Sequence, residues 1–325
     1  MSPRLSVVVP THEKLPLLRR ALAALAGQTL DPADWEIVVV DDGSTDGTAD
    51  WLAGEAPGWA GRLRVVSPGR NVGRAAARNL GGRAATGEWI LFLDDDIVAP
   101  PTLLDEHLER LVAHPGWGVI GLVRTATGIV DAPHFHYIDT RGVAKVDGDV
   151  VPARYLVTQN TSVPRAAFVG AGGFDERFAA YGFEDMELGF RLEDEQGVRF
   201  LPLRDPVPEH IHHHDLGAWL DKKRECGRGP LQLLARLHPH RLGEMRLDLV
   251  LDAPGGDGAS WPVRFARRLA RGPARGALEA LARRWPTGRG HVPRLFPLYA
   301  RLLDVLVLSA YCQGVSESGA ADPVA

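Results

Sequence analysis

The stretch Trp89-Ile-Leu-Phe-Leu-Asp-Asp-Asp-Ile97 decides how the rest of this sequence is interpreted. Five mostly apolar residues of high β propensity run directly into three carboxylates, which predicts a buried strand that ends at a cation site. A divalent metal ion that also binds phosphate oxygens commonly balances such acids, and hard oxygen ligands suit Mg²⁺ or Mn²⁺. An acidic turn after a strand would explain the same residues without a metal, because short motifs often occur by chance. The neighbouring segments decide between the two interpretations.

Two apolar segments upstream have the form of buried parallel strands. Leu5–Val9 stops at Pro10-Thr11-His12, and Glu36–Val40 ends in a second acidic group that begins with Asp41-Asp42. Helical or strand-like segments alternate with them: helices over residues 15–25, from 48 and over 71–85, and a strand over 63–66. This order predicts a parallel, right-handed α/β sheet. Ligands bind outside the carboxyl ends of such strands, so the acidic groups should gather there.

Length and composition are those of a globular protein. The chain has 325 residues, of which 45% are hydrophobic and 24% charged, with a net charge of −4. We expect no nucleic-acid partner. No apolar run is long enough to span a bilayer, and the first ten residues lack the regions of a signal peptide. Cys226 and Cys312 lie 86 positions apart and form no redox or metal motif, so we expect a cytoplasmic location.

Charge is distributed unevenly along the chain. Residues 238–325 carry 12 Arg and 8 acids, a local +4, which leaves −8 for residues 1–237. This asymmetry supports a two-part chain, and we predict a first domain over 1–237 (halves 1–98 and 99–237), a helical region over 238–313 and a disordered tail over 314–325. Ten Arg in residues 262–301 could form an acceptor-phosphate or membrane-surface patch, or a helical face packed on the acidic half. Leu302–Tyr311 is expected to be a core helix or a helix of a homodimer.

Two common phosphate-binding loops are absent from the sequence. No Gly-x-Gly-x-x-Gly turn follows the first strand, which argues against a dehydrogenase, and there is no Gly-x-x-x-x-Gly-Lys loop. The remaining way to hold a phosphate is through acids and a metal ion, which is typical of enzymes that use nucleotide sugars.

Six motifs together resemble those of the family 2 glycosyltransferases. In chain order they are Val7-Val-Val-Pro-Thr11, Val39-Val-Asp-Asp-Gly-Ser-Thr-Asp-Gly47, Asn71-x-Gly73 with Ala77-Arg-Asn79, Phe92-Leu-Asp-Asp-Asp96, Gly172-Gly-Phe-Asp-Glu176 and Tyr181-Gly-Phe-Glu-Asp185-x-Glu-Leu-Gly-x-Arg191. Each motif alone is weak, but their joint order is specific. The resemblance covers about residues 4–230. It implies a GT-A fold, which is Rossmann-like with a mostly parallel sheet and flanking helices, followed here by the C-terminal helical region.

The resemblance assigns the donor-binding residues to the first half. It places Pro10, Thr11, His12 and Asp42 at the nucleotide base, Arg74 at the donor, and Asp94 and Asp95 toward the ribose and sugar. The family usually has an aromatic residue at position 12, and His12 can also stack on a base. A UDP-sugar is the expected donor. For Asp42, an Asx-turn or helix cap beside Gly43 is an alternative role, because Asp-Gly-Ser is ordinary turn chemistry.

Metal binding is assigned by the same resemblance to Asp96 and to a later histidine. Mn²⁺ or Mg²⁺ would neutralise charge on the diphosphate leaving group. Pro208-Glu-His-Ile-His-His-His214 follows a predicted strand over 198–201, and His210 and His212 share one side of an extended segment. We therefore expect one of these two to be the ligand, whereas His213 or His214 is more often a solvated loop residue. A separate zinc site is an alternative for the four histidines.

Chemistry in the family is carried by the pair that corresponds to Glu184-Asp185. Gly182 supplies a turn, and the apolar spacing that follows puts both acids in the first turn of a helix. The resemblance implies that Asp185 is the base, kept ionised by the helix dipole, and that Glu184 holds an acceptor hydroxyl. A role limited to the helix dipole is the alternative. Arg191 is most simply a salt-bridge partner.

Between the two halves, residues 132–154 are polar and poorly periodic, which favours an acceptor-side loop or short hairpin. Gln159–Val163 resembles the strand that floors the sugar site. The sequence thus predicts an inverting, metal-dependent glycosyltransferase that acts on the hydroxyl of a glycan, lipid-linked or natural-product acceptor. A catalytically inactive nucleotide-sugar-binding protein that acts through its helical region is the alternative. A nucleotidyltransferase would need a Gly-rich basic loop after the first strand, and the sequence has none.

Overall fold

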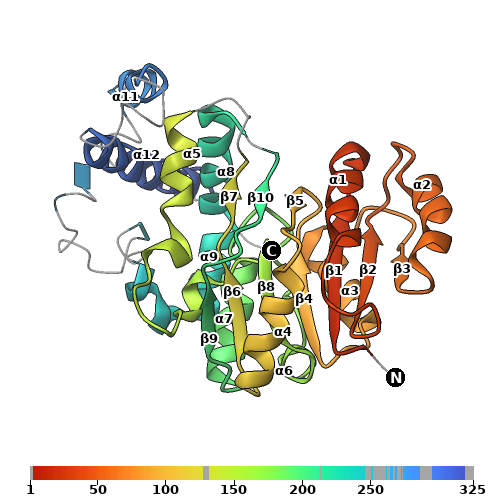
Figure 1. The fold of residues 1–325 in the computed structure, drawn as a ribbon. Coiled ribbons are helices and arrows are strands. Elements are labelled where there is room, and N and C mark those ends of the chain that lie inside the picture. The colour runs from red at the N-terminus through yellow and green to blue at the C-terminus, as the bar shows by residue number, and fades with distance from the viewer. Residues whose placement is uncertain are drawn as a thin grey trace. The chain divides into compact units, whose positions relative to one another are not determined.

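The fold is seen in a computed structural model that describes residues 3–126, 132–212, 214–245, 250–251, 274–285 and 295–318, with single positions at 261, 264, 265, 268 and 272 (Figure 1). Two compact units make up the chain. The first comprises Met1–Ile129, Arg141–Ala179 and Glu184–His212, and the second comprises Val130–Thr140, Ala180–Phe183 and His213–Ala325. The domain boundaries expected from sequence stay a prediction.

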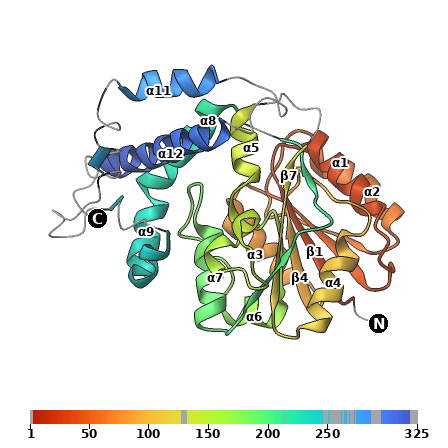
Figure 2. The same ribbon diagram turned by 60° about the vertical axis from the view of Figure 1, so that its left-hand side comes forward.

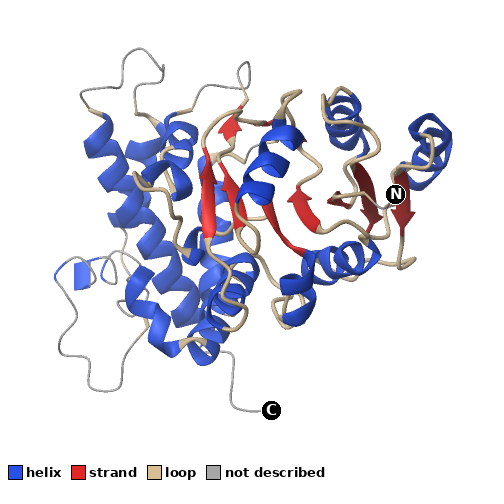
Figure 3. Cartoon of the chain, turned by 60° about the horizontal axis from the view of Figure 1, so that its bottom comes forward, coloured by secondary structure: helices blue, strands red, loops and turns tan. Residues whose placement is uncertain are grey.

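The first unit is a seven-stranded sheet with helices on both faces, as Figure 3 shows by colour. Its strand order is β3-β2-β1-β4-β8-β6-β9, and β8 runs antiparallel to β4 and β6 while the other neighbours are parallel. The elements are β1 (Leu5–Thr11), α1 (Leu15–Ala26), β2 (Trp35–Asp41), α2 (Thr48–Glu55), β3 (Leu63–Val66), α3 (Arg74–Ala84), β4 (Trp89–Leu93), β5 (Ile97–Val98), α4 (Leu103–Ala113), β6 (Gly118–Gly121), β7 (Arg124–Thr125), β8 (Asn160–Pro164), α6 (Arg165–Gly170), α7 (Glu184–Asp194), β9 (Phe200–Leu203) and β10 (Glu209–His210), with short 3₁₀ turns at Ala56–Trp59, Gly142–Lys145 and Ala153–Tyr155. The predicted α/β class and the strands β1 to β4 are confirmed.

Alternation along the central strands gives the sheet two apolar faces. Val7, Val9 and Leu91 belong to one buried cluster with leucines of α1, α2 and α4, which lie on that side in Figure 2. The opposite face is covered by α3 and α6. There a Cβ at Gly81 would lie 2.3 Å from a methyl carbon of Val8, so the glycine allows the helix to pack directly on the strands. This packing fixes the carboxyl ends of the strands at one edge.

Two predicted boundaries in the first unit were wrong. The helix expected over 71–85 begins at Arg74, because Gly73 has a φ of 88°, outside the helical region. The strand expected over 198–201 is β9, two residues later, where Phe200 to Leu203 are all buried against β6.

A second, three-stranded sheet with order β5-β10-β7 lies beyond the end of β4. In the antiparallel pairing of β10 with β5, His210 is opposite Ile97, and Ile211 N donates to the carbonyl oxygen of Asp96 at 2.9 Å. This register brings the histidine segment to the acidic end of β4, although more than a hundred residues separate them in sequence.

The second unit is helical in the described residues. It contains α5 (Pro133–Asp139), α8 (Leu216–Arg228), α9 (Pro230–Leu237), a 3₁₀ segment (Pro239–Met245), α11 (Ala274–Arg283) and α12 (Phe296–Ser318). An apolar cluster joins α8, α12 and Tyr137 of α5, so the helical C-terminal region is confirmed. The loop or hairpin expected over 132–154 was wrong at α5, because Pro133 begins a helix that buries Phe135 and Tyr137.

The last described helix, α12, is longer than the sequence indicated. Its 23 residues have a mean hydropathy of 1.2 over an 18-residue window that is 39% buried, so by length and composition alone it could cross a membrane. The prediction that no segment has this length was wrong, but Leu303 and Leu306 pack in the apolar cluster as in a core helix. Disorder from residue 314 was also wrong, since α12 continues to Ser318, and 319–325 lie outside the described residues. A cytoplasmic location stays a prediction.

Candidate active site

The three carboxylates after β4 differ in exposure and in partners. The side chain of Asp94 is 23% exposed, whereas those of Asp95 and Asp96 are 6% and 5% exposed. Lys14 Nζ lies 3.0 Å from Asp95 Oδ1 and 2.8 Å from Asp96 Oδ2. Burial raises the pKa of Asp95 to about 6 although the charge of Lys14 opposes the rise. Lys14, which the sequence analysis did not single out, is thus a close counter-ion of both buried acids.

His210 completes this side of the site. Its Nε2 lies 3.1 Å from Asp96 Oδ1. Burial would raise the pKa of Asp96, but the contact with His210 and the charge of Lys14 outweigh burial and hold this pKa well below its usual range. Apart from this imidazole, no donor among the described residues lies against the buried Asp96 Oδ1, and the ring is not ideally aligned for a hydrogen bond. A buried carboxylate oxygen beside an imidazole is a donor set that fits Mn²⁺ or Mg²⁺.

The other three histidines of the segment have different positions. His212 is half-buried in the first unit, two residues beyond the paired strand. His213 lies outside the described residues. His214 belongs to the second unit, where its carbonyl oxygen lies 3.0 Å from His134 Nε2 and its own Nε2 lies 2.6 Å from Lys222 Nζ. The geometry favours His210 as the residue that would share a cation with Asp96, and the role of His212 stays a prediction.

Glu184 and Asp185 open α7, as the sequence predicts. The chain enters the helix through Gly182 and Phe183, which have φ values of 104° and 71°, so a left-handed turn precedes the two acids. Asp185 accepts hydrogen bonds from Thr158 Oγ1 at 2.8 Å and Thr158 N at 3.3 Å. Burial raises the pKa of Asp185, and the charge of Arg78 and the Thr158 hydroxyl oppose the rise. The helix dipole was expected to keep Asp185 ionised, and burial acts in the opposite direction by favouring the neutral carboxyl group.

Arg78 connects the two groups of acids. Its guanidinium lies 2.9 Å from Asp94, 3.4 Å from Glu184 and 3.9 Å from Asp185, and its side chain is only 8% exposed. Arg74, one turn earlier on α3, lies 3.8 Å from Glu184. Burial and the charge of Asp185 raise the pKa of Glu184, while these two arginines lower it. The donor-side acid and the pair on α7 therefore surround one buried cation.

Other parts of the motifs hold the loops in place. Asn79 donates to Phe174 O and accepts from Phe174 N, at 2.9 and 2.7 Å, and so ties α3 to the Gly172–Glu176 motif. Arg191 pairs with Glu187 at 2.6 Å, which confirms its predicted salt bridge. These contacts fix α3 and α7, which carry the arginines and the acid pair.

The residues expected at the base lie at the ends of β1 and β2. Asp42 accepts from Val72 N at 2.7 Å and Gly73 N at 3.0 Å, so it organises the start of α3. Pro10 and Thr11 end β1, and His12 is exposed in the loop that follows. The capping role of Asp42 is compatible with binding of the base. Base binding by Pro10, Thr11, His12 and Asp42 stays a prediction.

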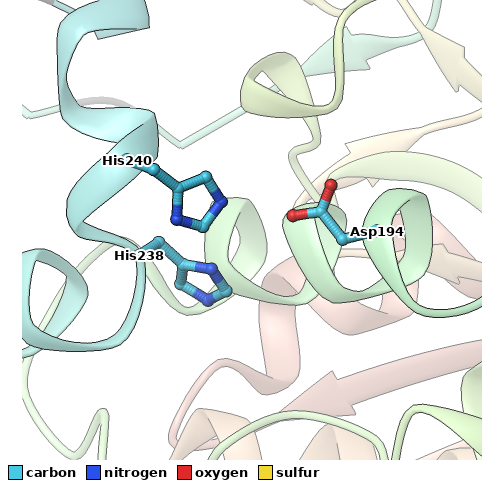
Figure 4. A group of neighbouring side chains, drawn as sticks. All are labelled: Asp194, His238 and His240. Atoms are coloured by element: carbon cyan, nitrogen blue, oxygen red, sulfur yellow. The ribbon is translucent and has the colours of Figure 1, made fainter.

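Three further potential ligands, drawn in Figure 4, were not singled out from the sequence. Asp194 is the last residue of α7 in the first unit. His238 and His240 follow α9 in the second unit, with ring centroids 6.2 Å apart. In the sequence, the only signal for these two potential ligands was the His-x-His spacing of His238 and His240 directly after a helix.

Comparisons with known proteins show which proteins this chain resembles in sequence and fold. Residues 6–155 match the model of glycosyl transferase family 2. The validoxylamine A glucosyltransferase of Streptomyces hygroscopicus subsp. limoneus is 34% identical over 223 residues, 58% of this chain and 48% of the relative. The N-acetylglucosaminyl-diphospho-decaprenol L-rhamnosyltransferase of Mycobacterium tuberculosis (strain ATCC 25618 / H37Rv) is 28% identical and covers 73% of this chain and 82% of its own length. The chain spans about half the length of the first curated relatives it matches.

Solved structures show the same fold. The mannosyltransferase PcManGT of Pyrobaculum calidifontis, in complex with GDP-Man and Mn²⁺, has a TM-score of 0.62 and 22% identity, with 96% of this chain and 87% of that chain covered. TarS 1–349 of S. aureus in complex with UDP has a TM-score of 0.54 and 16% identity, covering 98% and 92%. The fold is therefore GT-A, the architecture of glycosyltransferases. Residues 6–155 of this fold match the glycosyl transferase family 2 model, so this part of the chain is a domain of that kind.

Proposed function

We propose that this protein transfers a sugar from a nucleoside diphosphate to an acceptor hydroxyl, with inversion at the anomeric carbon and with a bound divalent cation. The observation that carries the proposal is the contact of one buried guanidinium, that of Arg78, with both Asp94 and the Glu184-Asp185 pair. Donor-side and acceptor-side acids thus belong to one site in the first unit. The match of residues 6–155 to glycosyl transferase family 2 and the 34% identity to a glucosyltransferase support the reaction class.

The donor is a nucleotide sugar. Complexes of similarly folded proteins with GDP-Man and with UDP-GlcNAc support this class. A UDP-sugar is our first candidate and a GDP-sugar the second. Pro10, Thr11, His12 and Asp42 hold the base, Arg74 contacts the donor, and Asp94 and Asp95 lie toward the ribose and sugar.

Asp96 and His210 hold the divalent cation, with His212 as a further ligand. When bound, Mn²⁺ or Mg²⁺ supplies Lewis-acid neutralisation of the charge that develops on the diphosphate. Complexes of similar folds with Mn²⁺ support the choice of metal. Asp96 contributes a buried oxygen, Oδ1, whose neighbour is the imidazole of His210 and which makes no well-aligned hydrogen bond among the described residues, so this atom is suited to a cation.

Asp185 takes the proton of the acceptor hydroxyl as the new sugar–oxygen bond forms. Burial raises its pKa above the ordinary value, and a higher pKa makes the carboxylate a stronger base. The two Thr158 hydrogen bonds fix its orientation. Glu184 positions the acceptor, because its carboxylate is anchored by Arg78 and Arg74 on the same edge.

The pairing of the acids with basic residues supports inversion over retention. A double displacement needs a carboxylate nucleophile beneath the sugar. Asp94 is bound to Arg78, and Asp95 and Asp96 are bound to Lys14, whereas Asp185 is held mainly by Thr158. A single in-line displacement with Asp185 as base needs no further acid.

The test is to identify the product and to neutralise the base. Nucleoside diphosphate release is measured over a panel of UDP- and GDP-sugars with natural-product and lipid-linked acceptors, and proton NMR gives the anomeric configuration. Asp185→Asn should lose roughly 10²–10⁴ in kcat, about 3–5 kcal/mol of barrier, and still bind the donor. The exposed Asp147→Asn is the matched control and should keep full activity. Retention of configuration, or near-normal turnover of Asp185→Asn, would refute the mechanism.

A nucleotide-sugar-binding protein without activity is the second candidate. It predicts donor binding without release of nucleoside diphosphate for every acceptor tested. The close pairing of all five acids with basic residues, which a binding role alone does not require, favours the enzyme.

Peripheral membrane contact is part of the proposal for a lipid-linked acceptor. Trp261 and Phe265 are 67% and 41% exposed and stacked 5.4 Å apart, and the exposed Arg264 and Arg268 share their helical spacing. Aromatic and basic residues on one helical face suit an anionic lipid surface. Sedimentation with phosphatidylglycerol vesicles tests this contact: Trp261→Ala combined with Phe265→Ala should reduce binding, and equal binding by the wild-type protein and this variant would contradict it.

A further inference from the structure

Lys14 is held in place by its neighbours in sequence. Glu13 has a φ of 55°, which is rare for a residue with a side chain, and its N–H donates to Ser44 Oγ at 3.1 Å. Its carboxylate accepts from Thr45 N and Thr45 Oγ1, at 2.7 and 2.9 Å. On the other side, Leu15 N donates to Asp46 Oδ2 at 2.9 Å. The loop after β2 therefore fixes the backbone on both sides of Lys14.

This anchoring carries the ammonium to the acids at the end of β4. Nζ lies 3.0 Å from Asp95 Oδ1 and 2.8 Å from Asp96 Oδ2, so it bridges the two carboxylates as a bound cation would. The Lys14 side chain is 35% exposed, whereas those of the two aspartates are almost completely buried. A lysine ammonium is a compact charge on a flexible stem, so it can turn away without a change in the backbone.

We propose that Lys14 is a built-in counter-ion that competes with the divalent cation for Asp95 and Asp96. The inference rests on the proposed function, because it assumes that Asp96 is a metal ligand. Without donor, the ammonium neutralises the two buried acids and lowers their affinity for the metal. A divalent cation at Asp96 Oδ1 would lie close to the ammonium on Oδ2 of the same carboxylate, and the repulsion between the two cations would favour departure of Lys14.

The same competition couples metal to donor. A displaced ammonium loses two carboxylate partners, and the diphosphate of a bound nucleotide offers it new anionic ones. Nucleotide binding therefore reduces the cost of displacing Lys14 and tightens metal binding in the wild-type protein. In a protein without the Lys14 charge, this contribution to the coupling disappears.

The experiment measures Mn²⁺ binding by electron paramagnetic resonance of free Mn²⁺, with the full chain and with neither donor nor acceptor. Lys14→Met should bind Mn²⁺ at least tenfold more tightly than the wild-type protein, and Lys14→Gln should do the same. Lys14→Arg, which keeps the charge, should stay close to the wild-type affinity. The exposed Lys145→Met removes the same charge elsewhere in the first unit and should change nothing.

Two further arms locate the site and test the coupling. Asp96→Asn added to Lys14→Met should abolish the gain in affinity. Addition of UDP should tighten Mn²⁺ binding by a larger factor in the wild-type protein than in Lys14→Met. Equal or weaker Mn²⁺ binding by both Lys14→Met and Lys14→Gln would overturn the proposal, as would the absence of Mn²⁺ binding in every variant. Failure to detect sugar transfer is a separate result, because this measurement uses no sugar donor.

Discussion

Replacement of Arg78 by methionine is the sharpest test of how the site is held together. The guanidinium is 8% exposed and contacts Asp94, Glu184 and Asp185, at 2.9, 3.4 and 3.9 Å. Arg78→Met keeps much of the apolar volume but leaves three carboxylates without their shared cation. Removal of one partner from a buried ion pair typically costs about 3–5 kcal/mol, because the remaining charge is buried and uncompensated. We expect a loss of this size in the stability of the first unit.

The loss should depend on pH in a direction that follows from the acids. Burial raises the pKa values of Glu184 and Asp185 in the folded state, and the charge of Arg78 opposes that rise. Without Arg78 both values rise further above those of the unfolded chain. A carboxyl group with a raised folded pKa costs stability at high pH, and that cost disappears as the pH falls through the folded pKa. Arg78→Met should therefore be more destabilised at pH 8 than at pH 5.5.

Urea denaturation followed by tryptophan fluorescence at these two pH values measures both effects. Arg177→Met is the matched control, because Arg177 is 65% exposed where it pairs with Asp175, and an ion pair with an exposed partner contributes little to stability. Glu184→Gln added to Arg78→Met should recover part of the loss, since it removes one uncompensated charge. If Arg78→Met costs no more than Arg177→Met, or if its loss is the same at both pH values, the account of Arg78 as the shared counter-ion is refuted.

Three other outcomes test separate parts of the site. Asp96→Ala should abolish the Mn²⁺-dependent tightening of nucleoside diphosphate binding, and calorimetry that shows the same enhancement in the variant would remove Asp96 from the metal site. Thr158→Val deletes a hydroxyl that lowers the pKa of Asp185, so the acid limb of the kcat–pH profile should move to higher pH, and an unmoved limb would contradict this role. Truncation before Pro239 exposes the buried face of α8, including Leu220, so it should cost solubility before chemistry, and a soluble, monomeric, fully active fragment would contradict this order.

The central sheet was predictable because its strands are buried on both faces. Continuous apolar runs such as Leu5–Val9 have few other stable conformations than a buried strand. Helices between them, with leucines at helical spacing, cover one face of the sheet. Parallel strands place their carboxyl ends together, so the acids after β4 and β2 were expected at one edge. Local pattern and global fold agree in this part of the chain.

The counter-ions were not predictable from local pattern. Arg78 is one of many arginines in a chain that has only four lysines, so its identity carries little information. Its partner Glu184 lies 106 residues away, and only the folded sheet brings the two together. Lys14 follows the strand loop whose other residues were assigned to the base, and its contact with Asp96 spans 82 residues. Such pairs depend on tertiary packing and leave no periodic signal.

Tertiary contacts also account for the error at the C-terminal end of α12. Small and polar residues after residue 313 favour disorder when they are considered alone. In the second unit, a Cβ at Gly314 would lie 2.0 Å from the carbonyl oxygen of Arg224, so glycine lets α12 lie directly against α8. Glu317 of α12 then pairs with Arg224 and Arg228 of α8. Close helix packing and this ion pair keep the segment helical against its local composition.

The two basic residues at the centre of the site differ in a way that matches the proposed reaction. Arg78 is buried, planar and in contact with three acids, so it cannot leave without exposing all of them, and the charge near Asp185 stays constant through the reaction. Lys14 is partly exposed on a flexible stem, so the charge at Asp96 can be exchanged. A transferase must release its nucleotide after each turnover, and its base must return to the ionised form before the next. An exchangeable lysine on the donor side and a fixed arginine beside the base satisfy both requirements.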